Sequence, residues 1–358
     1  MTIDATTSDR LRILVVDDSA VYRQIVRRVV SAHELVDSVD VASNGAIALR
    51  KMDTNAYDLI SLDMEMPEVD GIGVLEAMRA RQNHTPTVVL SAVTKAGAAK
   101  TIRALSLGAG ACVLKPDGPS LDENLTQLED ALHPFINRVA LDRNVSTSPS
   151  ITAPTSIDHL QRTRPTELVV IGCSTGGPAA LLDVLGALPA TFPAPIVIAQ
   201  HMPPIVTQSL AADLNSNCAL TVAEASDGET IQPGCVYIAP GGQHLTLRQV
   251  FSTTRLCVND NPPRNFCRPS VDELFESVPA QLRSETVAVI LTGMGTDGRD
   301  GCRNLRADGA TILAQDEDTC VIYGMPKAVH AEGLADAVLP LASIASALER
   351  LGHVRRAA

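Results

Sequence analysis

The sequence is poor in aromatic residues: they make up 3% of its 358 residues, and Trp is absent. Hydrophobic cores must therefore be filled by Ala, Val, Leu and Ile, which suits strands buried on both faces of a parallel sheet. Few aromatic rings are left to stack on nucleic-acid bases. The 41 acidic and 29 basic residues give a formal net charge of −12, which repels a phosphate backbone. We therefore expect no nucleic-acid partner.

Features of a membrane span, an export signal and a zinc ribbon are also missing. No apolar run approaches the ~18 residues that a spanning helix needs. The segment Met1–Arg10 is polar and lacks the basic start and apolar stretch of a signal peptide. The eight Cys are scattered without a CxxC spacing, which argues against a zinc ribbon or a thioredoxin-like site. We expect a cytoplasmic protein with reduced thiols and no membrane insertion.

The length and the apolar pattern predict two α/β domains joined by a linker. In residues 1–142, five short apolar runs alternate with helical patterns, which predicts a flavodoxin-like parallel sheet of strand order 2-1-3-4-5. Residues 143–165 are rich in Ser, Thr and Pro and indicate an interdomain linker, with an ordered surface loop as the alternative. Residues 166–358 predict a second doubly wound α/β domain. Within it, "GCVYIAPGGQHLTL" predicts two strands around a Gly turn, as a β-hairpin.

Polar residues follow the expected strands of the first domain at their carboxyl ends: Asp17 and Asp18, Asp63, Ser91, and Lys115. In a doubly wound sheet, functional side chains gather beyond these ends. Three carboxylates repel one another unless a cation is present, and hard oxygen ligands suit Mg²⁺. Such a site binds a phosphoryl group, with Asp63 as a carboxylate nucleophile. The alternatives are a helix N-cap for the first two acids and a solvated loop lysine.

The segments "LVVDDS", "LDMEMPEVDG", "LSA" and "LKP" make residues 11–116 resemble a response-regulator receiver domain. The resemblance implies phosphorylation of Asp63 by a partner histidine kinase, with Ser91 and Lys115 sensing the acyl phosphate. It also implies a Mg²⁺ site made by Asp17, Asp18, Asp63 and the backbone carbonyl of Glu65. Receivers often carry an aromatic switch residue three positions before the Lys. This chain has Cys112 there, so we do not expect an aromatic rotamer switch.

The second domain carries a G-x-S-x-G segment, Gly172–Gly176, between an aliphatic strand and a helix. In that context the motif forms a tight turn that exposes Ser174, and the helix N-terminus places N–H groups beside a developing oxyanion. A nucleophilic Ser needs a base, and the base needs an orienting acid. His201 and Asp297 each follow an expected strand. They are the candidate general base and orienting acid.

Several alternatives stay open at this stage. Cys173 is a second candidate nucleophile, and His244 is a second candidate base, ranked lower because it falls in the expected hairpin region. Asp297 is also a candidate N-cap for the helix that follows it. "GCSTGG" and "GMGTDGRDG" are possible phosphate cradles, although neither matches the P-loop or a clean G-x-G-x-x-G. No spacing of His, Cys and acids in residues 166–358 matches a zinc site.

Six segments are similar to the chemotaxis response-regulator protein-glutamate methylesterases: "GCSTGGP", "AQHMPP", "YIAPGGQHL", "RPSVDELF", "LTGMGTDG" and "YGMPKAV". The resemblance implies the catalytic triad Ser174, His201 and Asp297. It implies hydrolysis of glutamate methyl esters and deamidation of glutamines on methyl-accepting chemoreceptors, with no cofactor for the esterase reaction. A chemotaxis histidine kinase is the implied phosphodonor. We expect the backbone N–H groups of Thr175 and Met294 to be the oxyanion donors.

Two other output classes compete with a hydrolase. A DNA-binding output is disfavoured by the acidic balance and by the lack of a compact basic helix–turn–helix. A scaffolding output would bind a receptor without chemistry. A further expectation concerns control: the receiver covers the mouth of the active site, and phosphorylation of Asp63 weakens that contact.

Overall fold

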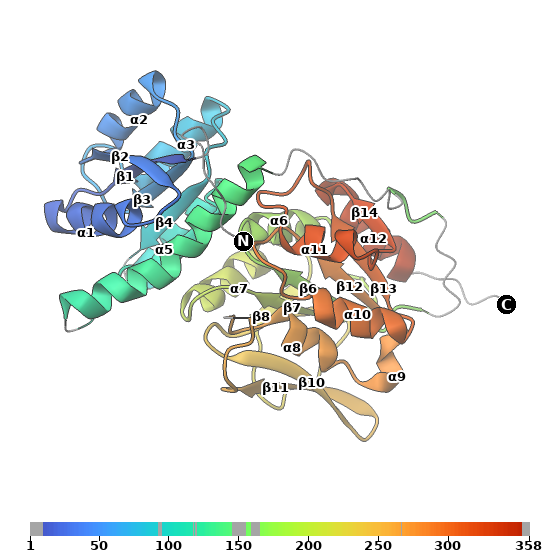
Figure 1. Cartoon of the computed structure of the whole chain (residues 1–358). Coiled ribbons are helices and arrows are strands. Elements are labelled where there is room, and N and C mark those ends of the chain that lie inside the picture. The colour runs from blue at the N-terminus through green and yellow to red at the C-terminus, as the bar shows by residue number, and fades with distance from the viewer. Residues whose placement is uncertain are drawn as a thin grey trace. The chain divides into compact units, whose positions relative to one another are not determined.

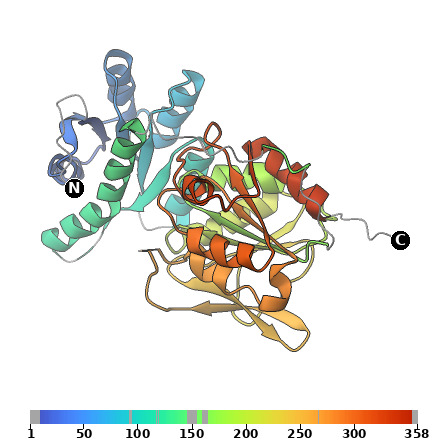
Figure 2. The same ribbon diagram turned by 45° about the vertical axis from the view of Figure 1, so that its right-hand side comes forward.

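The computed structural model describes residues 10–91, 95–116, 118, 120–144, 155–158, 165–265 and 267–352. The chain divides into two compact units, residues 1–149 and 150–358, shown in Figure 1 and Figure 2. None of the helices in these described ranges combines the length and apolar character that crossing a membrane would require. Of the predicted linker 143–165, residues 145–154 and 159–164 lie outside the described residues.

The first unit is built on a five-stranded parallel sheet of order β2-β1-β3-β4-β5. Its strands are β1 (Leu11–Val16), β2 (Val36–Ala42), β3 (Leu59–Asp63), β4 (Thr87–Ser91) and β5 (Ala111–Leu114). Central β3 and β4 are buried along their whole length, whereas edge strand β2 is largely accessible. The continuous apolar runs therefore occupy the middle of the sheet, as parallel sheets covered on both faces require. The predicted strand order is confirmed.

Helices cover both faces of this sheet: α1 (Ala20–Ser31), α2 (Gly45–Thr54), α3 (Gly71–Ala80), α4 (Lys95–Ser106) and α5 (Leu121–Asn144). Helices α1 and α5 pack together, while α3 contacts both α2 and α4. The local sequence determines where these helices begin and which face they bury. In α1, Val26 and Val29 are buried, and the Ser19 hydroxyl caps the first turn by accepting from the N–H of Tyr22 at 3.3 Å.

The second unit is built on a seven-stranded parallel sheet of order β14-β13-β12-β6-β7-β9-β8. Its strands are β6 (Leu168–Cys173), β7 (Ile196–Gln200), β8 (Thr221–Glu224), β9 (Cys235–Ile238), β12 (Thr286–Ile290), β13 (Thr311–Gln315) and β14 (Ala337–Leu339). Strands β6 and β12 lie side by side at its centre and are fully buried. The loops that follow them therefore meet at one edge of the sheet.

Seven helices cover this sheet in the described residues: α6 (Gly177–Gly186), α7 (Val206–Asn217), α8 (Val271–Glu276), α9 (Ala280–Arg283), α10 (Arg299–Ala307), α11 (Met325–Ala331) and α12 (Leu341–Gly352). Helix α6 packs against α7 and α12, whereas α10 packs against α8 and α11. A two-stranded antiparallel hairpin, β10 (His244–Val250) and β11 (Thr253–Asn259), lies beside α8 in both views. The unit is thus a doubly wound α/β domain, as predicted, and it carries a β-hairpin.

The strands of the hairpin differ from those that the sequence predicts. The two strands of "GCVYIAPGGQHLTL" do not pair with each other. Strand β9 instead joins the main sheet between β7 and β8, and β10 pairs with the following strand β11. The aliphatic Val236 and Ile238 of β9 are completely buried, so burial in the parallel sheet outweighs the local turn.

Helix α8 is anchored by Phe275, which is completely buried in the core cluster beneath α8, α10 and α11. Replacing a buried Phe by Ala removes apolar contact and leaves a cavity. We expect Phe275→Ala to lower the free energy of unfolding by about 3–5 kcal/mol, measured by urea unfolding followed by circular dichroism. The matched control is Phe251→Ala, since Phe251 is 98% exposed and should change stability by less than about 0.5 kcal/mol. Equal effects of the two changes would contradict this account of the core.

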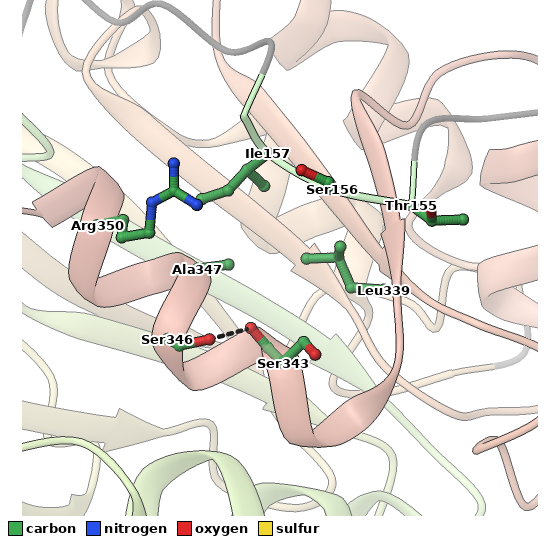
Figure 3. Close-up of a pocket in the computed structure, with 8 residues that line it drawn as sticks. All are labelled: Thr155, Ser156, Ile157, Leu339, Ser343, Ser346, Ala347 and Arg350. Atoms are coloured by element: carbon green, nitrogen blue, oxygen red, sulfur yellow. Dashed lines mark hydrogen bonds between the residues drawn. The ribbon is translucent and has the colours of Figure 1, made fainter.

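Residues 155–157 lie beside α12 and line a pocket of about 210 Å³ (Figure 3). Arg350 of α12 pairs with Asp158 at 2.8 Å, and both side chains are mainly exposed. The pocket is lined by Thr155, Ser156, Ile157, Leu339, Ser343, Ser346, Ala347 and Arg350. None of the candidate catalytic side chains is among them, so this pocket does not mark the catalytic site.

Candidate active site

Ser174 lies in the turn between β6 and α6, partly exposed. Its N–H donates to the carbonyl of Thr292 at 3.0 Å, and its own carbonyl accepts from the N–H of Gly177 at 2.8 Å. Gly176 completes the turn with φ of +80°, a conformation that favours glycine. The turn therefore presents Ser174 as a G-x-S-x-G segment requires.

The loop after β12 packs directly on this turn. A Cβ added at Gly293 would lie 2.9 Å from Cβ of Ser174 and 3.0 Å from its backbone nitrogen. Only glycine at position 293 permits this approach without displacing the nucleophile turn. The Thr292 hydroxyl strengthens the contact by donating to the carbonyl of Thr175 at 2.9 Å.

The N–H groups of Thr175 and Met294 donate to no acceptor within the described residues. Thr175 follows the candidate nucleophile directly, and Met294 follows the glycine that contacts it. N–H groups without an acceptor near a serine are suited to bind the negative oxygen of a tetrahedral intermediate. Thr175 and Met294 therefore stay the predicted oxyanion donors.

His201 follows β7 at the same edge of the sheet, and its N–H donates to the carbonyl of Cys173 at 3.1 Å. The ring Nε2 lies 2.8 Å from Oδ2 of Asp297. The other ring nitrogen, Nδ1, lies 3.7 Å from Sγ of Cys267. Within the described residues the Ser174 hydroxyl has no hydrogen bond to this ring. Such bonds are often long before substrate binds. Nδ1 is the ring nitrogen that Asp297 does not occupy.

Asp297 is 2% exposed and surrounded by hydrogen-bond donors. Besides His201, its oxygens accept from the Ser270 hydroxyl (2.9 Å), the N–H groups of Val271 (2.7 Å) and Asp272 (3.2 Å), and the Asn265 amide (3.2 Å). Burial alone would raise the pKa of Asp297, but the bonds to His201 and to the start of α8 hold the pKa well below its usual range. The carboxylate is therefore ionised and fixed in place.

The alternative role of Asp297 as N-cap of the following helix does not match the structure. The residue at the N-cap of α10 is Gly298, which has no side-chain cap bond. Asp297 instead satisfies N–H groups at the start of α8, a helix whose own cap is Ser270. The carboxylate thus holds α8 and His201 at the same time.

The protonation of His201 reflects competing effects. Burial lowers the pKa of an imidazole, because a charged ring is poorly solvated inside the protein. The hydrogen bonds to Asp297 and Cys267 outweigh burial and raise the pKa of His201 to about 10. The Asp297 carboxylate beside Nε2 therefore favours the positive charge that the ring acquires whenever it takes up a proton.

The two alternative residues occupy structural positions. Cys173 is completely buried, and burial raises the pKa of its thiol far above the usual range. His244 is also completely buried: its Nδ1 accepts from the N–H of Ser270 at 3.2 Å, and its Nε2 lies 3.2 Å from the carbonyl of Pro262. Neither side chain is available for nucleophilic or base chemistry at the turn of Ser174.

In the first unit, the strand ends bring the predicted acids and the lysine together. Lys115 Nζ lies 2.9 Å from Asp17 and 2.8 Å from Asp63. Oxygens of Asp17, Asp18 and Asp63 all lie within 4.8 Å of one another. Burial raises the pKa of Asp63, although Lys115 opposes that effect. Three close carboxylate oxygens are a donor set that fits a hard divalent cation.

A buried polar chain extends from this site to β5. The Thr101 hydroxyl donates to Oγ of Ser91 at 2.9 Å, and Sγ of Cys112 lies 3.8 Å from Oγ1 of Thr101. The Ser91 hydroxyl lies 3.4 Å from the carbonyl of Gly97 in α4. Cys112 lies three residues before Lys115, where receivers often carry an aromatic ring. Its thiol is thus linked to Ser91 through the hydroxyl of Thr101.

Sequence reasoning does not identify three residues that build the candidate catalytic site: Cys267, Asn265 and Gly293. Cys267 directly precedes the quoted segment "RPSVDELF", and Gly293 lies within "LTGMGTDG". The glycine content of the second segment is a signal for close backbone contact. No spacing rule connects Cys267 or Asn265 to His201 and Asp297, because the contact depends on tertiary packing.

Family models match both units. Residues 169–348 match the CheB methylesterase model, and residues 13–126 match the response regulator receiver domain. Two similar curated proteins are protein-glutamate methylesterase/protein-glutamine glutaminases. That of Halalkalibacterium halodurans is 44% identical over 345 residues, covering 95% of this chain and 98% of that protein. That of Desulfotalea psychrophila is 41% identical over 351 residues, covering 94% and 96%.

A solved structure is similar to the second unit. The CheB methylesterase catalytic domain of Thermotoga maritima is 47% identical, with a TM-score of 0.51, and covers 52% of this chain and 100% of that one. The match therefore extends to backbone arrangement as well as sequence. Together with relatives that align over nearly the whole length, it shows that this chain belongs to the CheB methylesterase family and carries a receiver domain at its N-terminal end.

Proposed function

We propose that the chain is a protein-glutamate methylesterase and protein-glutamine glutaminase, acting on methyl-accepting chemoreceptors during chemotactic adaptation. The observation that carries the proposal is the hydrogen bond between His201 and Asp297, held beside a serine turn with free N–H groups. Ester and amide cleavage at a glutamyl carbonyl are both acyl transfers, so one site serves both. The names of the relatives support the same chemistry.

The mechanism proceeds through an acyl-enzyme. Ser174 Oγ attacks the ester carbonyl while His201 takes the hydroxyl proton, and Asp297 stabilises the imidazolium. The N–H groups of Thr175 and Met294 donate to the oxyanion. The tetrahedral intermediate expels methanol, or ammonia from glutamine, which leaves with the proton from His201. Water then attacks the acyl-enzyme while His201 takes its proton, and His201 passes that proton to Ser174 Oγ as the glutamate is released.

The receiver domain is proposed to control this reaction through phosphorylation of Asp63 by a chemotaxis histidine kinase. A carboxylate oxygen of Asp63 attacks the phosphorus atom of the kinase phosphohistidine, the P–N bond breaks and the kinase histidine leaves. Lys115 pairs with the transferred phosphoryl group, and Ser91 is its hydroxyl partner. Mg²⁺ would be held by Asp17, Asp18, Asp63 and the carbonyl of Glu65. When bound, the ion supplies charge neutralisation for phosphoryl transfer. No cofactor is proposed for the esterase reaction.

The proposed function is tested by methanol release from methylated receptor, with and without a small-molecule phosphodonor. We expect release by the purified chain and an increase when the phosphodonor and Mg²⁺ are present. Ammonia release from receptor glutamines tests the deamidase reaction in the same way. Absence of methanol release under both conditions would contradict the assignment.

The contact between Gly293 and Ser174 provides a sharper test of the site geometry. We expect Gly293→Ala to lower kcat/KM by about 10²-fold, since a displacement of about 1 Å at the reacting centre has effects of that size. The matched control is Gly186→Ala in α6, where an added Cβ has nothing nearer than 4.0 Å. Its methanol release should stay near that of the unmodified chain. Equal activity of both variants would contradict the close packing described above.

A further inference from the structure

Three potential metal ligands meet at the catalytic edge of the second unit. His201, Cys267 and Asp297 each offer a ligand atom, and these atoms all lie within 4.8 Å of one another. His201 and Cys267 are partly exposed, whereas Asp297 is buried. The three residues come from separate segments of the chain, which is why no sequence spacing reveals the cluster.

The geometry suits a zinc-like ion held by two of them. A tetrahedral Zn²⁺ with bonds of about 2.3 Å to sulfur and about 2.0 Å to nitrogen places those atoms roughly 3.5 Å apart. Sγ of Cys267 lies 3.7 Å from Nδ1 of His201, so little movement is needed. Asp297 holds the opposite nitrogen, Nε2, at 2.8 Å. A carboxylate that receives the second ring N–H is the usual support of a metal-bound histidine.

The ligand chemistry also discriminates between cations. Thiolate and imidazole are preferred by Zn²⁺ and similarly soft ions, whereas Mg²⁺ prefers oxygen ligands and retains its waters. The Mg²⁺ proposed for the receiver is therefore a poor competitor here. Coordination releases the thiol proton of Cys267, and any proton on Nδ1, to solvent.

We propose that Nδ1 of His201 and Sγ of Cys267 form a binding site for Zn²⁺ or a similarly thiophilic divalent cation, which inhibits the esterase by occupying the nitrogen that serves Ser174. Water completes the coordination, and Asp297 stays bound to Nε2. The ion is an inhibitor and not a cofactor of the reaction. The inhibition rests on the proposed function, because it requires His201 to act as the base. The binding of the ion itself does not depend on the proposed function.

The first test measures inhibition of the full-length chain. Methanol release is followed while free Zn²⁺ is set by a chelator buffer, and the rates with and without Zn²⁺ are compared within each variant. We expect Cys267→Ser to raise the inhibition constant at least about tenfold, since thiolate is a much stronger ligand for Zn²⁺ than a hydroxyl. The matched control is Cys257→Ser, another partly buried cysteine, and its inhibition constant should not change. Equal inhibition of the unmodified chain and Cys267→Ser would overturn the proposal.

The second test measures binding without activity. Cd²⁺ is titrated into the unmodified chain, Ser174→Ala, Cys267→Ser and Cys267→Ala, and the ultraviolet thiolate-to-Cd²⁺ absorption is recorded. We expect a signal in the first two proteins that is lost from both Cys267 variants, whose folding is checked by circular dichroism. A signal that persists without Cys267 overturns the site. Binding at Cys267 without inhibition overturns the inhibitory part of the proposal and also the role of His201 as base. Absence of methanol release in all samples contradicts the proposed function and leaves the Cd²⁺ signal to decide the binding site.

Discussion

Replacing Ser174 by Ala should lower the rate of methanol release by about 10³-fold or more while the chain stays folded. The change removes the atom proposed to form the acyl-enzyme, and the neighbouring thiol of Cys173 is completely buried and cannot replace it. The backbone bonds that fix the turn, from Ser174 to Thr292 and from Gly177 to Ser174, do not involve the side chain. A small residual rate from the oxyanion N–H groups is expected.

The measurement combines methanol release with labelling by a fluorophosphonate, which reacts with activated serines. The unmodified chain should be labelled at Ser174, and Ser174→Ala should not be labelled. The matched control is Ser216→Ala on α7, where the exposed hydroxyl donates to the carbonyl of Ala212 at 2.9 Å. This variant should keep both labelling and activity. Methanol release by Ser174→Ala close to the normal rate would refute the triad, and an unlabelled chain would favour a scaffold without chemistry.

Replacing Asp63 by Asn should abolish the response to a phosphodonor. An amide cannot form an acyl phosphate, so incorporation of phosphoryl groups from phosphoramidate should fall to background. The rate of methanol release with phosphodonor, divided by the rate without it, should be above one in the unmodified chain and equal to one in Asp63→Asn. The ratio is the informative quantity, because Asp63 pairs with Lys115 at 2.8 Å and its replacement disturbs the site even without phosphorylation.

The control for this prediction is Asp53→Asn in α2, where the exposed carboxylate pairs with Arg81 at 2.6 Å. An exposed ion pair contributes about 0–1 kcal/mol, so this change should leave phosphoryl incorporation and the ratio as they are. Removal of Mg²⁺ with a chelator should reproduce the loss seen in Asp63→Asn. Phosphoryl incorporation that persists in Asp63→Asn would show that another residue is the acceptor.

Much of the fold could be predicted because local pattern and tertiary position agree. In the first unit the continuous apolar strands β3 and β4 are central, and the polar residues at strand ends meet where a doubly wound sheet requires. The same logic places Ser174, His201 and Asp297 at one edge of the second sheet. Those residues follow parallel strands, whose carboxyl ends point the same way.

The hairpin and the surroundings of the triad could not be predicted for a physical reason. A Gly turn after β9 is compatible with a local hairpin or with a strand that joins a distant neighbour, and the choice depends on which sheet buries Val236. The contacts of Asp297 with α8, and of His201 with Cys267, join segments tens of residues apart. Such contacts depend on packing of the whole unit.

The binding of Asp297 to both His201 and the first turn of α8 has a practical consequence for work that needs an inert but native protein. Trapping a bound partner for microscopy, or using the chain as bait, calls for a form that retains the native surface around the candidate active site. Removing Asp297 would leave donors of α8 without an acceptor and disturb a neighbouring helix. The Ser174 hydroxyl holds no neighbouring helix in place. An inactive but native form is therefore better made by replacing Ser174 than by replacing Asp297.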